Sequence, residues 1–427
     1  MAGASLREQP HSVLPKLRGY EDVSSAAEAR KRFVVLVTDG EQRAALAVVR
    51  SLGAAGHSVI VTSKRRRSLA GASRFARRHI TLPSALSDPA GFLEILAAVV
   101  RSCGVEVLIP ITDESLISVL GSRERFPGVI IPFATLDQFT RISNKPLLLD
   151  IAAREGIAIP EQLQLASAAD ARMLDPASVQ FPVVLKPARS VVSVNGRSAK
   201  LGVSHAADWP TLTGLLRDYP DAAYPILLQR RIVGDGIAVF LLIWDGKLIA
   251  VCGHRRIREA PPSGGVSVYR EAVMPEASLI ARSRALLDQI GWQGVAMVEY
   301  KLDEATQTPY LMEVNGRFWG SLQLAIDAGV DFPALLVAAS SGRATDLEPR
   351  TPTHPGVRSR WEWGEVNHLI ARVRRSTAQL SLPPGSPSRA RVLKDFFSWH
   401  RVDRLEVFRF SDPAPFLQET ADWVRRR

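Results

Sequence analysis

Residues 294–321 read GVAMVEYKLDEATQTPYLMEVNGRFWGS and carry the strongest structural signal in the chain. Two apolar stretches flank a polar turn, a pattern that predicts a β-hairpin. Side chains alternate between the two faces of a strand, so Leu311, Glu313 and Asn315 should share one face of the second strand. Glu299 lies on the first strand and should face the same side if the two faces coincide.

Glu299, Glu313 and Asn315 would then converge. Two ionised carboxylates about 4 Å apart repel by roughly 4 kcal/mol at an effective dielectric near 20. A shared proton, a lysine or a divalent cation must offset that repulsion, and two carboxylates with an amide oxygen suit Mg²⁺. The alternative is that Glu299 pairs with Lys301 or with an arginine at the surface.

Length and composition indicate a folded chain of several domains. Its 427 residues favour two or three domains. The hydrophobic share of 46% and the charged share of 23% are those of a soluble globular protein. No apolar run approaches the roughly 18 residues that a membrane helix needs, and the first 30 residues show no secretory signal. Two cysteines exclude a disulfide framework, and we expect a cytoplasmic protein.

The formal net charge is +11, yet its distribution does not favour nucleic-acid binding. Only nine of the 54 basic residues are lysines, and the arginines are spread along the chain. The short cluster at 64–67 lacks interleaved aromatic residues or a recognisable reading motif. A solvated surface, or a site for ATP or an acidic substrate, accounts for the excess.

The N-terminal part shows a strand–helix alternation. A short apolar run at 33–38, helical spacing at 41–55 and a second apolar run at 58–62 predict a parallel βαβ unit. A helix near 88–102 and strands at 105–110 and 129–133 should extend it. The prediction is a doubly wound, Rossmann-like domain ending near residue 140.

The turn after the first strand argues against a nicotinamide dinucleotide. It reads Thr38-Asp39-Gly40-Glu41 and lacks G-x-G-x-x-G, and its acidic side chains would repel a pyrophosphate. Residues 112–114 follow a later strand and either face a ligand cleft or cap a helix.

The middle of the chain changes to an α+β pattern. Ser143-Asn144-Lys145-Pro146 should open a helix that runs to about Arg154. Mostly antiparallel strands should follow at 181–187, 226–233, 237–243 and 247–253, and then a helix at 278–290. The tail from about 350 has no interpretable motif and either covers a cleft or forms an oligomer contact, such as that of a homodimer.

The string Glu313 to Ser321, EVNGRFWGS, resembles the E-x-N-x-R-x-x-G signature of the ATP-grasp superfamily, particularly its carbamoyl-phosphate-synthase-like and carboxylate–amine ligases. The resemblance implies that Glu299, Glu313 and Asn315 hold Mg²⁺, or Mn²⁺ as an alternative, between the phosphates of ATP. It also implies that Arg317 contacts the phosphoryl or acyl group.

Further segments match the same superfamily in the expected order. Lys186, in FPVVLKP, and Lys145, at a helix start, resemble its two phosphate-binding lysines. Residues 189–202 stand in the place of its phosphate-covering loop, with Asn195-Gly196 as the turn. Residues 227–234, LLQRRIVG, resemble the hinge that presents its backbone to adenine. Arg230 replaces the acid that commonly follows the glutamine, which leaves Asp235 as a weak substitute for the ribose contact.

An arginine-rich strand and a serine–glycine loop lie between this hinge and the hairpin. Arg256 and the loop residues Ser263 and Gly264 are candidates for holding an anionic carboxylate near the γ-phosphate. Surface exposure of the arginines is the alternative, and a metal site at Cys252 and His254 lacks a further ligand nearby. The residues expected to bind the nucleotide are Lys145, Lys186, Gln229, Arg230, Arg231, Ile232, Asp235, Ser263 and Gly264. The expected catalytic residues are Arg317, Arg256 and Lys186.

The resemblance therefore implies a Rossmann-like domain at 31–140 and an ATP-grasp domain at 141–345, whose lid covers about 146–230. A loose arm at 1–30 and an extension at 346–427 would flank them. The activity implied is ATP-dependent activation of a small carboxylate as an acyl phosphate, followed by transfer to an amine or other nucleophile. A phosphotransferase or carbamoyl-phosphate-type enzyme and a non-catalytic nucleotide-binding regulator remain alternatives. Neither nucleic acid nor a membrane is an expected partner.

Overall fold

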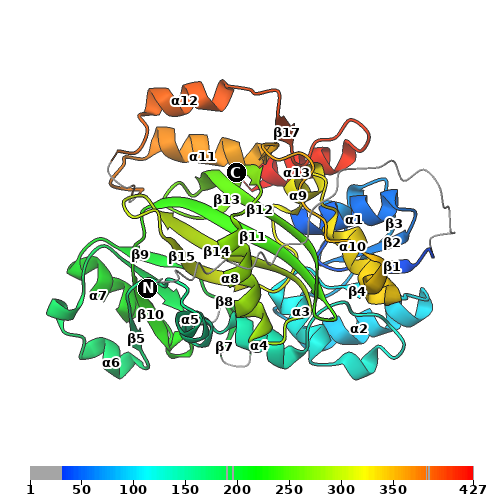
Figure 1. The fold of residues 1–427 in the computed structure, drawn as a ribbon, viewed down its shortest axis with the longest axis horizontal. Coiled ribbons are helices and arrows are strands. Elements are labelled where there is room, and N and C mark those ends of the chain that lie inside the picture. The colour runs from blue at the N-terminus through cyan, green and yellow to red at the C-terminus, as the bar shows by residue number, and fades with distance from the viewer. Residues whose placement is uncertain (1–30, 189–190, 195–196, 381, 383–384, 427) are drawn as a thin grey trace, which may run out of the picture. The chain divides into compact units, whose positions relative to one another are not determined.

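Four parallel strands begin the described chain in the computed structural model (Figure 1). They are β1 (Val34–Val37), β2 (Ser58–Ser63), β3 (Ala76–Thr81) and β4 (Val107–Ile109), in the order β3-β2-β1-β4. Helices α1 (Arg43–Ala54) and α2 (Pro89–Ser102) connect them, close to the predicted bounds. The prediction of a strand at 129–133 is wrong, because Ile130 forms only an isolated bridge with Val107.

The structure describes residues 31–188, 191–194, 197–380, 382 and 385–426. The expected arm at 1–30 and the expected turn Asn195-Gly196 lie outside these ranges. Contacts between Cα atoms divide the chain into Met1–Arg32 and Phe33–Arg427, and the elements from β1 to α13 belong to the second unit.

Three helices lead from the parallel sheet to the next part of the chain: α3 (Asp113–Leu120), α4 (Leu136–Ser143) and α5 (Lys145–Arg154). Thr112 caps α3, since its side chain accepts a hydrogen bond from the Ser115 amide. Asn144 caps α5 in the same way through the Leu147 amide, which confirms the predicted start of that helix.

A smaller antiparallel sheet forms the segment that the sequence predicts to be a lid. Its strands, in the order β5-β10-β6-β9, are β5 (Gln162–Leu165), β10 (Ile226–Arg230), β6 (Val183–Pro187) and β9 (Ser204–Ala206). The helices α6 (Ala168–Arg172) and α7 (Trp209–Asp218) and the two-stranded ribbon β7 (Val191–Val194) and β8 (Arg197–Lys200) belong to the same segment. Leu185, Leu212 and Leu228 belong to a hydrophobic core separate from the main one.

The largest sheet has seven strands in the order β15-β14-β11-β12-β13-β16-β17. Its first five strands along the chain are β11 (Gly234–Trp244), β12 (Lys247–Ala260), β13 (Val266–Val273), β14 (Gly294–Asp303) and the edge strand β15 (Pro309–Asn315), and α8 (Ala277–Asp288) precedes β14. Strands β11 to β15 pair antiparallel, as the short links predict, and the hairpin β14–β15 is confirmed.

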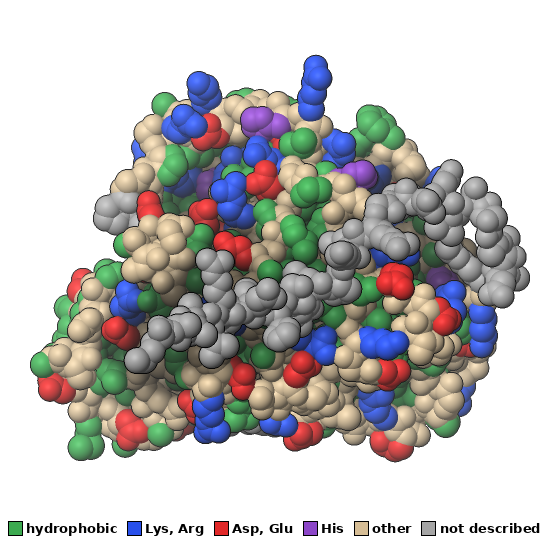
Figure 2. All heavy atoms as spheres, viewed as in Figure 1, with side chains coloured by type: hydrophobic (Ala, Val, Ile, Leu, Met, Phe, Trp, Pro, Cys, Tyr) green, Lys and Arg blue, Asp and Glu red, His purple; other side chains and the backbone are tan. Residues whose placement is uncertain are grey.

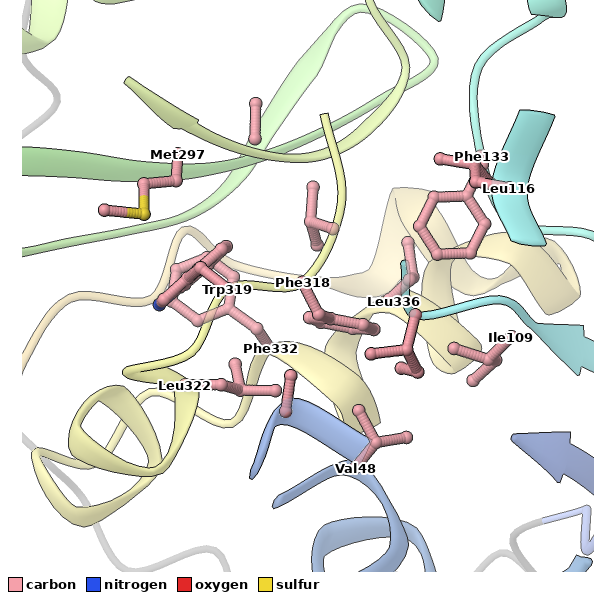
Figure 3. Close-up of a cluster of buried hydrophobic side chains, with 14 of the residues drawn as sticks. Val48, Ile109, Leu116, Phe133, Met297, Phe318, Trp319, Leu322, Phe332 and Leu336 are labelled. Carbon is pink, nitrogen blue, oxygen red and sulfur yellow. The ribbon is translucent and has the colours of Figure 1, made fainter. Parts of the chain in front are cut away.

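One continuous hydrophobic core joins this sheet to the N-terminal strands (Figure 3). Phe318 and Trp319, directly after the hairpin motif, are both buried, and Trp319 stacks on Phe240 with ring centroids 4.2 Å apart. Helices α9 (Leu322–Asp327) and α10 (Phe332–Ala338) complete this core with Leu322 and Phe332.

The C-terminal extension continues the same sheet. It contains β16 (Arg358–Arg360), α11 (Glu362–Arg374), α12 (Arg389–Phe397), β17 (Asp403–Leu405) and α13 (Ala414–Arg425). Strand β16 pairs antiparallel with β13, and β17 pairs parallel with β16. Glu406 forms ion pairs with Arg270 of β13 and with Arg43 of α1, so a buried charge network ties the extension to two other parts of the chain.

Acidic and basic side chains are interspersed on the face seen in Figure 2, which agrees with the even spread of arginine in the sequence. Of the described helices, none is both long enough and apolar enough to cross a bilayer.

Candidate active site

Two acidic residues of the hairpin lie opposite each other in register, Glu299 on β14 and Glu313 on β15. The Asn315 amide nitrogen donates hydrogen bonds to both carboxylates, at 3.0 Å to Glu299 Oε1 and 3.2 Å to Glu313 Oε1. The predicted convergence of these three side chains is confirmed.

The strand carrying Glu313 is less regular than predicted. The pairing shifts between Glu299 and Tyr300, so that Met312 and Glu313 both line the cleft described below. Leu311, expected on the same face as Glu313, is instead fully buried in the core. An irregularity of this kind inserts one residue and breaks the two-residue alternation on which the prediction relied.

The two carboxylates differ in their electrostatic surroundings. Burial raises the pKa of Glu299, although Arg256, which forms an ion pair with it, acts in the opposite direction. Burial would also raise the pKa of Glu313, but Lys145 and Lys186 outweigh that effect and hold its pKa below the usual value. The pKa values of the two carboxyl groups are therefore shifted in opposite directions.

Two lysines face this acidic pair, one buried and one partly buried. Lys145 is 7% exposed at the first turn of α5, and Lys186 on β6 donates a hydrogen bond to Met312 Sδ at 3.7 Å. Burial lowers the pKa of Lys186 to about 8; Lys145 adds to the shift, and Glu313 opposes it. Residues from the smaller sheet, α5 and the hairpin thus meet at one point, as their order in the sequence predicts.

Arg317 has partners on two elements. Its guanidinium donates to both oxygens of Asp113 at the start of α3, at 2.7 and 3.3 Å, and to Asn315 Oδ1 at 3.2 Å. These bonds fix the Asn315 amide with its nitrogen toward the carboxylates. Arg317 does not line the cleft, so its geometry favours positioning Asn315 over direct contact with a substrate.

The predicted hinge residues lie in β10 and directly after it, along one wall of the cleft. Gln229 is buried and donates to Gln162 Oε1 at 2.8 Å, and its own side-chain oxygen accepts no hydrogen bond from the residues that the structure describes. The Arg230 guanidinium lies 5.5 Å from the Tyr310 ring centre. Asp235 is half exposed, with Arg255 at 3.9 Å.

The expected anion-binding loop closes toward the same wall. The Ser263 carbonyl oxygen accepts a hydrogen bond from Arg231 at 3.5 Å. Arg256 forms ion pairs with Glu259 at 3.0 Å and with Glu299, so two acids already surround it. The predicted role of Arg256 as a free carboxylate-binding cation therefore gains no support from this arrangement.

A cleft of about 850 Å³ joins these groups, a volume in the range of small-molecule sites. The predicted residues that line it are Lys186, Gln229, Arg230, Arg231, Ile232, Asp235, Arg256, Ser263, Gly264, Glu299 and Glu313. Lys145, Asn315 and Arg317 do not line it. Sequence reasoning missed His205, Met312 and, from the extension, His368, Arg372 and Asp395. No motif marks them, and only the tertiary fold brings them together.

The donor set fits a hard divalent cation in its chemistry. Among the described residues, no group of three or more histidines, cysteines or acids is placed to hold a metal ion, so such an ion would depend on two carboxylates and one amide. Glu299 and Glu313 supply carboxylate oxygen atoms, Asn315 can supply its amide oxygen only after its side chain turns, and the cleft leaves room for water and phosphate ligands.

Residues 223–364 match the model of a family described as ATP-grasp in the biosynthetic pathway with Ter operon. An L-amino acid ligase from Bacillus licheniformis is 18% identical and superposes with a TM-score of 0.58, covering 75% of this chain and 78% of that one. An N5-carboxyaminoimidazole synthetase from Staphylococcus aureus, solved with ADP, is 11% identical with a TM-score of 0.57, covering 75% and 79%. The biotin carboxylase domain of a Hydrogenobacter thermophilus 2-oxoglutarate carboxylase, solved with MgADP, is 15% identical with a TM-score of 0.55, covering 76% and 73%.

None of the curated protein sequences matches the chain. The structural likenesses establish the fold, which is that of the ATP-grasp superfamily. The recognition of that superfamily from the hairpin motif, and the mixed α/β and α+β fold class, are confirmed.

Proposed function

We propose that this protein is an ATP-dependent ligase, which activates a small carboxylate as an acyl phosphate and transfers the acyl group to an amine or other nucleophile. The observation that carries the proposal is the meeting of Glu299, Glu313 and Asn315 with Lys186 beside one cleft. The solved structures with ADP or MgADP support it, because they share the fold.

Each group has a role that its surroundings suggest. Lys145 and Lys186 would pair with the phosphates of ATP, and the hinge at 229–233 would take the adenine. Glu299, Glu313 and Asn315 would hold Mg²⁺, which neutralises charge on the phosphates when bound. Arg317 donates to the Asn315 oxygen, so coordination of the ion by Asn315 would require that hydrogen bond to break and the amide to turn.

The reaction proposed has two steps. An oxygen of the substrate carboxylate attacks the γ-phosphorus in line, and the bond between that phosphorus and the leaving ADP oxygen breaks. The amine then attacks the acyl carbon, phosphate leaves, and the amine loses a proton. The products are an amide, ADP and phosphate. The proposal also places the protein in the cytoplasm.

The direct test is a screen of acid and amine pairs for ADP formation, with mass detection of the products. An amide product supports the ligase. A stable phosphorylated product without an amine acceptor would instead favour a phosphotransferase. Nucleotide binding with no ADP formation in any mixture would favour a regulatory protein. The observation that favours this alternative is the Arg256–Glu299 ion pair, which occupies one of the proposed metal ligands.

Lys186 predicts the pH dependence of the activity. With its pKa near 8, the free enzyme loses this cation as the pH rises, and kcat/KM for ATP should fall by about tenfold per pH unit above that value. A pH profile of kcat/KM is the measurement. The Lys186→Arg variant stays charged, so its alkaline fall should disappear. A wild-type profile that stays flat to pH 10 would exclude Lys186 as a phosphate contact.

A further inference from the structure

Helix α11 of the C-terminal extension presents three buried polar residues to one side. Glu365, His368 and Arg372 are 3%, 9% and 6% exposed and lie at spacings of three and four residues, which places them along one helical face. The helix packs on β12, and His368 and Arg372 line the cleft that also contains Lys186 and Glu313. The extension therefore forms one wall of the candidate active site.

Two of these three residues have well-matched partners. Glu365 accepts hydrogen bonds from the Nε and Nη2 atoms of Arg258, the first at 2.8 Å. His368 Nδ1 lies 2.6 Å from the carbonyl oxygen of Glu259, which can only accept, so Nδ1 carries the proton. Burial lowers the pKa of His368, so its ring is neutral near pH 7 and Nε2 remains a hydrogen-bond acceptor.

Arg372 differs from them. Its guanidinium donates to the carbonyl oxygen of Pro387, and no described carboxylate lies within ion-pair distance of it. Burial and the nearby Arg389 lower the pKa of Arg372, as expected for a cation without a neighbouring acid. A buried charge normally has a partner of opposite charge, so this part of the cleft lacks an anion.

We propose that Arg372 binds an anionic group of the substrate, a carboxylate or a phosphate, at the α11 end of the cleft. The substrate is then a small acid with a second anionic group besides the carboxylate that reacts. His368, one turn away, offers an acceptor for an N–H or O–H beside that group. This inference rests on the proposed ligase function, and it makes Arg372 a determinant of substrate specificity.

The phosphate-binding role proposed for Lys145 and Lys186 does not extend to Arg372. Lys145 and Lys186 reach Glu313 from α5 and β6, whereas Arg372 comes from a helix that the matched family segment, 223–364, does not contain beyond its first turn. The nucleotide machinery predicted from the sequence is thus complete without it. An anion at Arg372 is better assigned to the second substrate than to ATP.

Binding of three acids of similar length, measured by calorimetry in saturating MgADP, tests the inference. Succinate and phosphonopropionate carry a second anionic group, and butyrate does not. Both dianions should bind at least tenfold more tightly than butyrate, since a hydrogen-bonded charge contact changes affinity on the order of tenfold to a hundredfold. The ratio of succinate to phosphonopropionate affinity identifies which anion the site prefers.

The matched variants are Arg372→Gln and Arg374→Gln. Arg374 lies on the same helix but is exposed, so its variant should bind all three acids as the wild type does. Arg372→Gln should lose the preference for the dianions while keeping its affinity for ADP. If that variant does not fold, the preference of the wild-type protein for the two dianions over butyrate still tests the proposal.

Failure of the proposed function and failure of the Arg372 assignment would give different results. A protein that does not bind MgADP would reject the proposed function. A protein that binds MgADP but shows equal affinity for the three acids, or no binding of any, would reject the assignment of Arg372 alone. A dianion preference that survives in Arg372→Gln would do the same.

Discussion

Replacing Glu313 by glutamine should lower kcat for ADP formation on the order of a thousandfold while the fold persists. The substitution keeps the size of the side chain and removes the ionised carboxylate that Lys145 and Lys186 face. It also removes one of the two charges proposed to hold Mg²⁺, an ion whose contribution to a transition state is worth several kcal/mol, at about 1.4 kcal/mol for each factor of ten. A coupled assay for ADP and a thermal melt are the two measurements.

The matched control is Glu304→Gln, in the exposed turn of the same hairpin. It removes one negative charge from the same element and should leave kcat within about twofold, as surface substitutions usually have small effects. Undiminished turnover in Glu313→Gln would refute the site. An equal loss in both variants would mean that general hairpin charge, rather than the acidic pair, supports the reaction.

Removing the Glu406 carboxylate should be the most destabilising single change outside the site. Arg270 is 0% exposed and Glu406 3% exposed, and Arg43 also contacts Glu406 at 2.7 Å. Glu406→Ala would leave two cations together in a buried network, a loss for which about 3–5 kcal/mol of unfolding free energy is typical. Urea denaturation followed by tryptophan fluorescence measures that loss.

Two comparisons sharpen this experiment. Glu348→Ala removes an exposed acid at the start of the extension and should change the unfolding free energy by less than about 0.5 kcal/mol. The double variant Arg270→Met with Glu406→Leu removes both buried charges and should recover part of the lost stability. A single Glu406→Ala variant as stable as the wild type would show that the network contributes nothing measurable.

The parts of the fold predicted best are those with local patterns. The hairpin around Glu313 has apolar stretches on both sides of a polar turn, and helix α5 has a cap and an early proline, so both can be predicted from sequence. Strand β3 was missed because its sequence, ARRHIT, has few apolar residues to show a buried face. Strands β16 and β17 have three residues each, too short for a periodic signal; β16 forms by pairing with β13, and β17 by pairing with β16.

The candidate site divides in the same way. Glu299, Glu313 and Lys186 carry a motif or a strand position and were found, and the structure places them together. The irregular pairing near Met312 could not be predicted, because it depends on how the two strands meet. His368 and Arg372 are ordinary helix residues in sequence, and their place in the cleft depends on contacts with β12, more than a hundred residues earlier.

The pairing of β16 with β13 has a consequence for anyone who wishes to shorten the protein. A chain truncated near residue 345 would leave the edge of β13 at Tyr269, Arg270 and Glu271 without its present partner strand. An exposed strand edge of this kind is a template for intermolecular pairing. Fragments of this kind should accumulate as insoluble aggregates, so production of a chain that ends near residue 345 calls for a substitute strand supplied in trans.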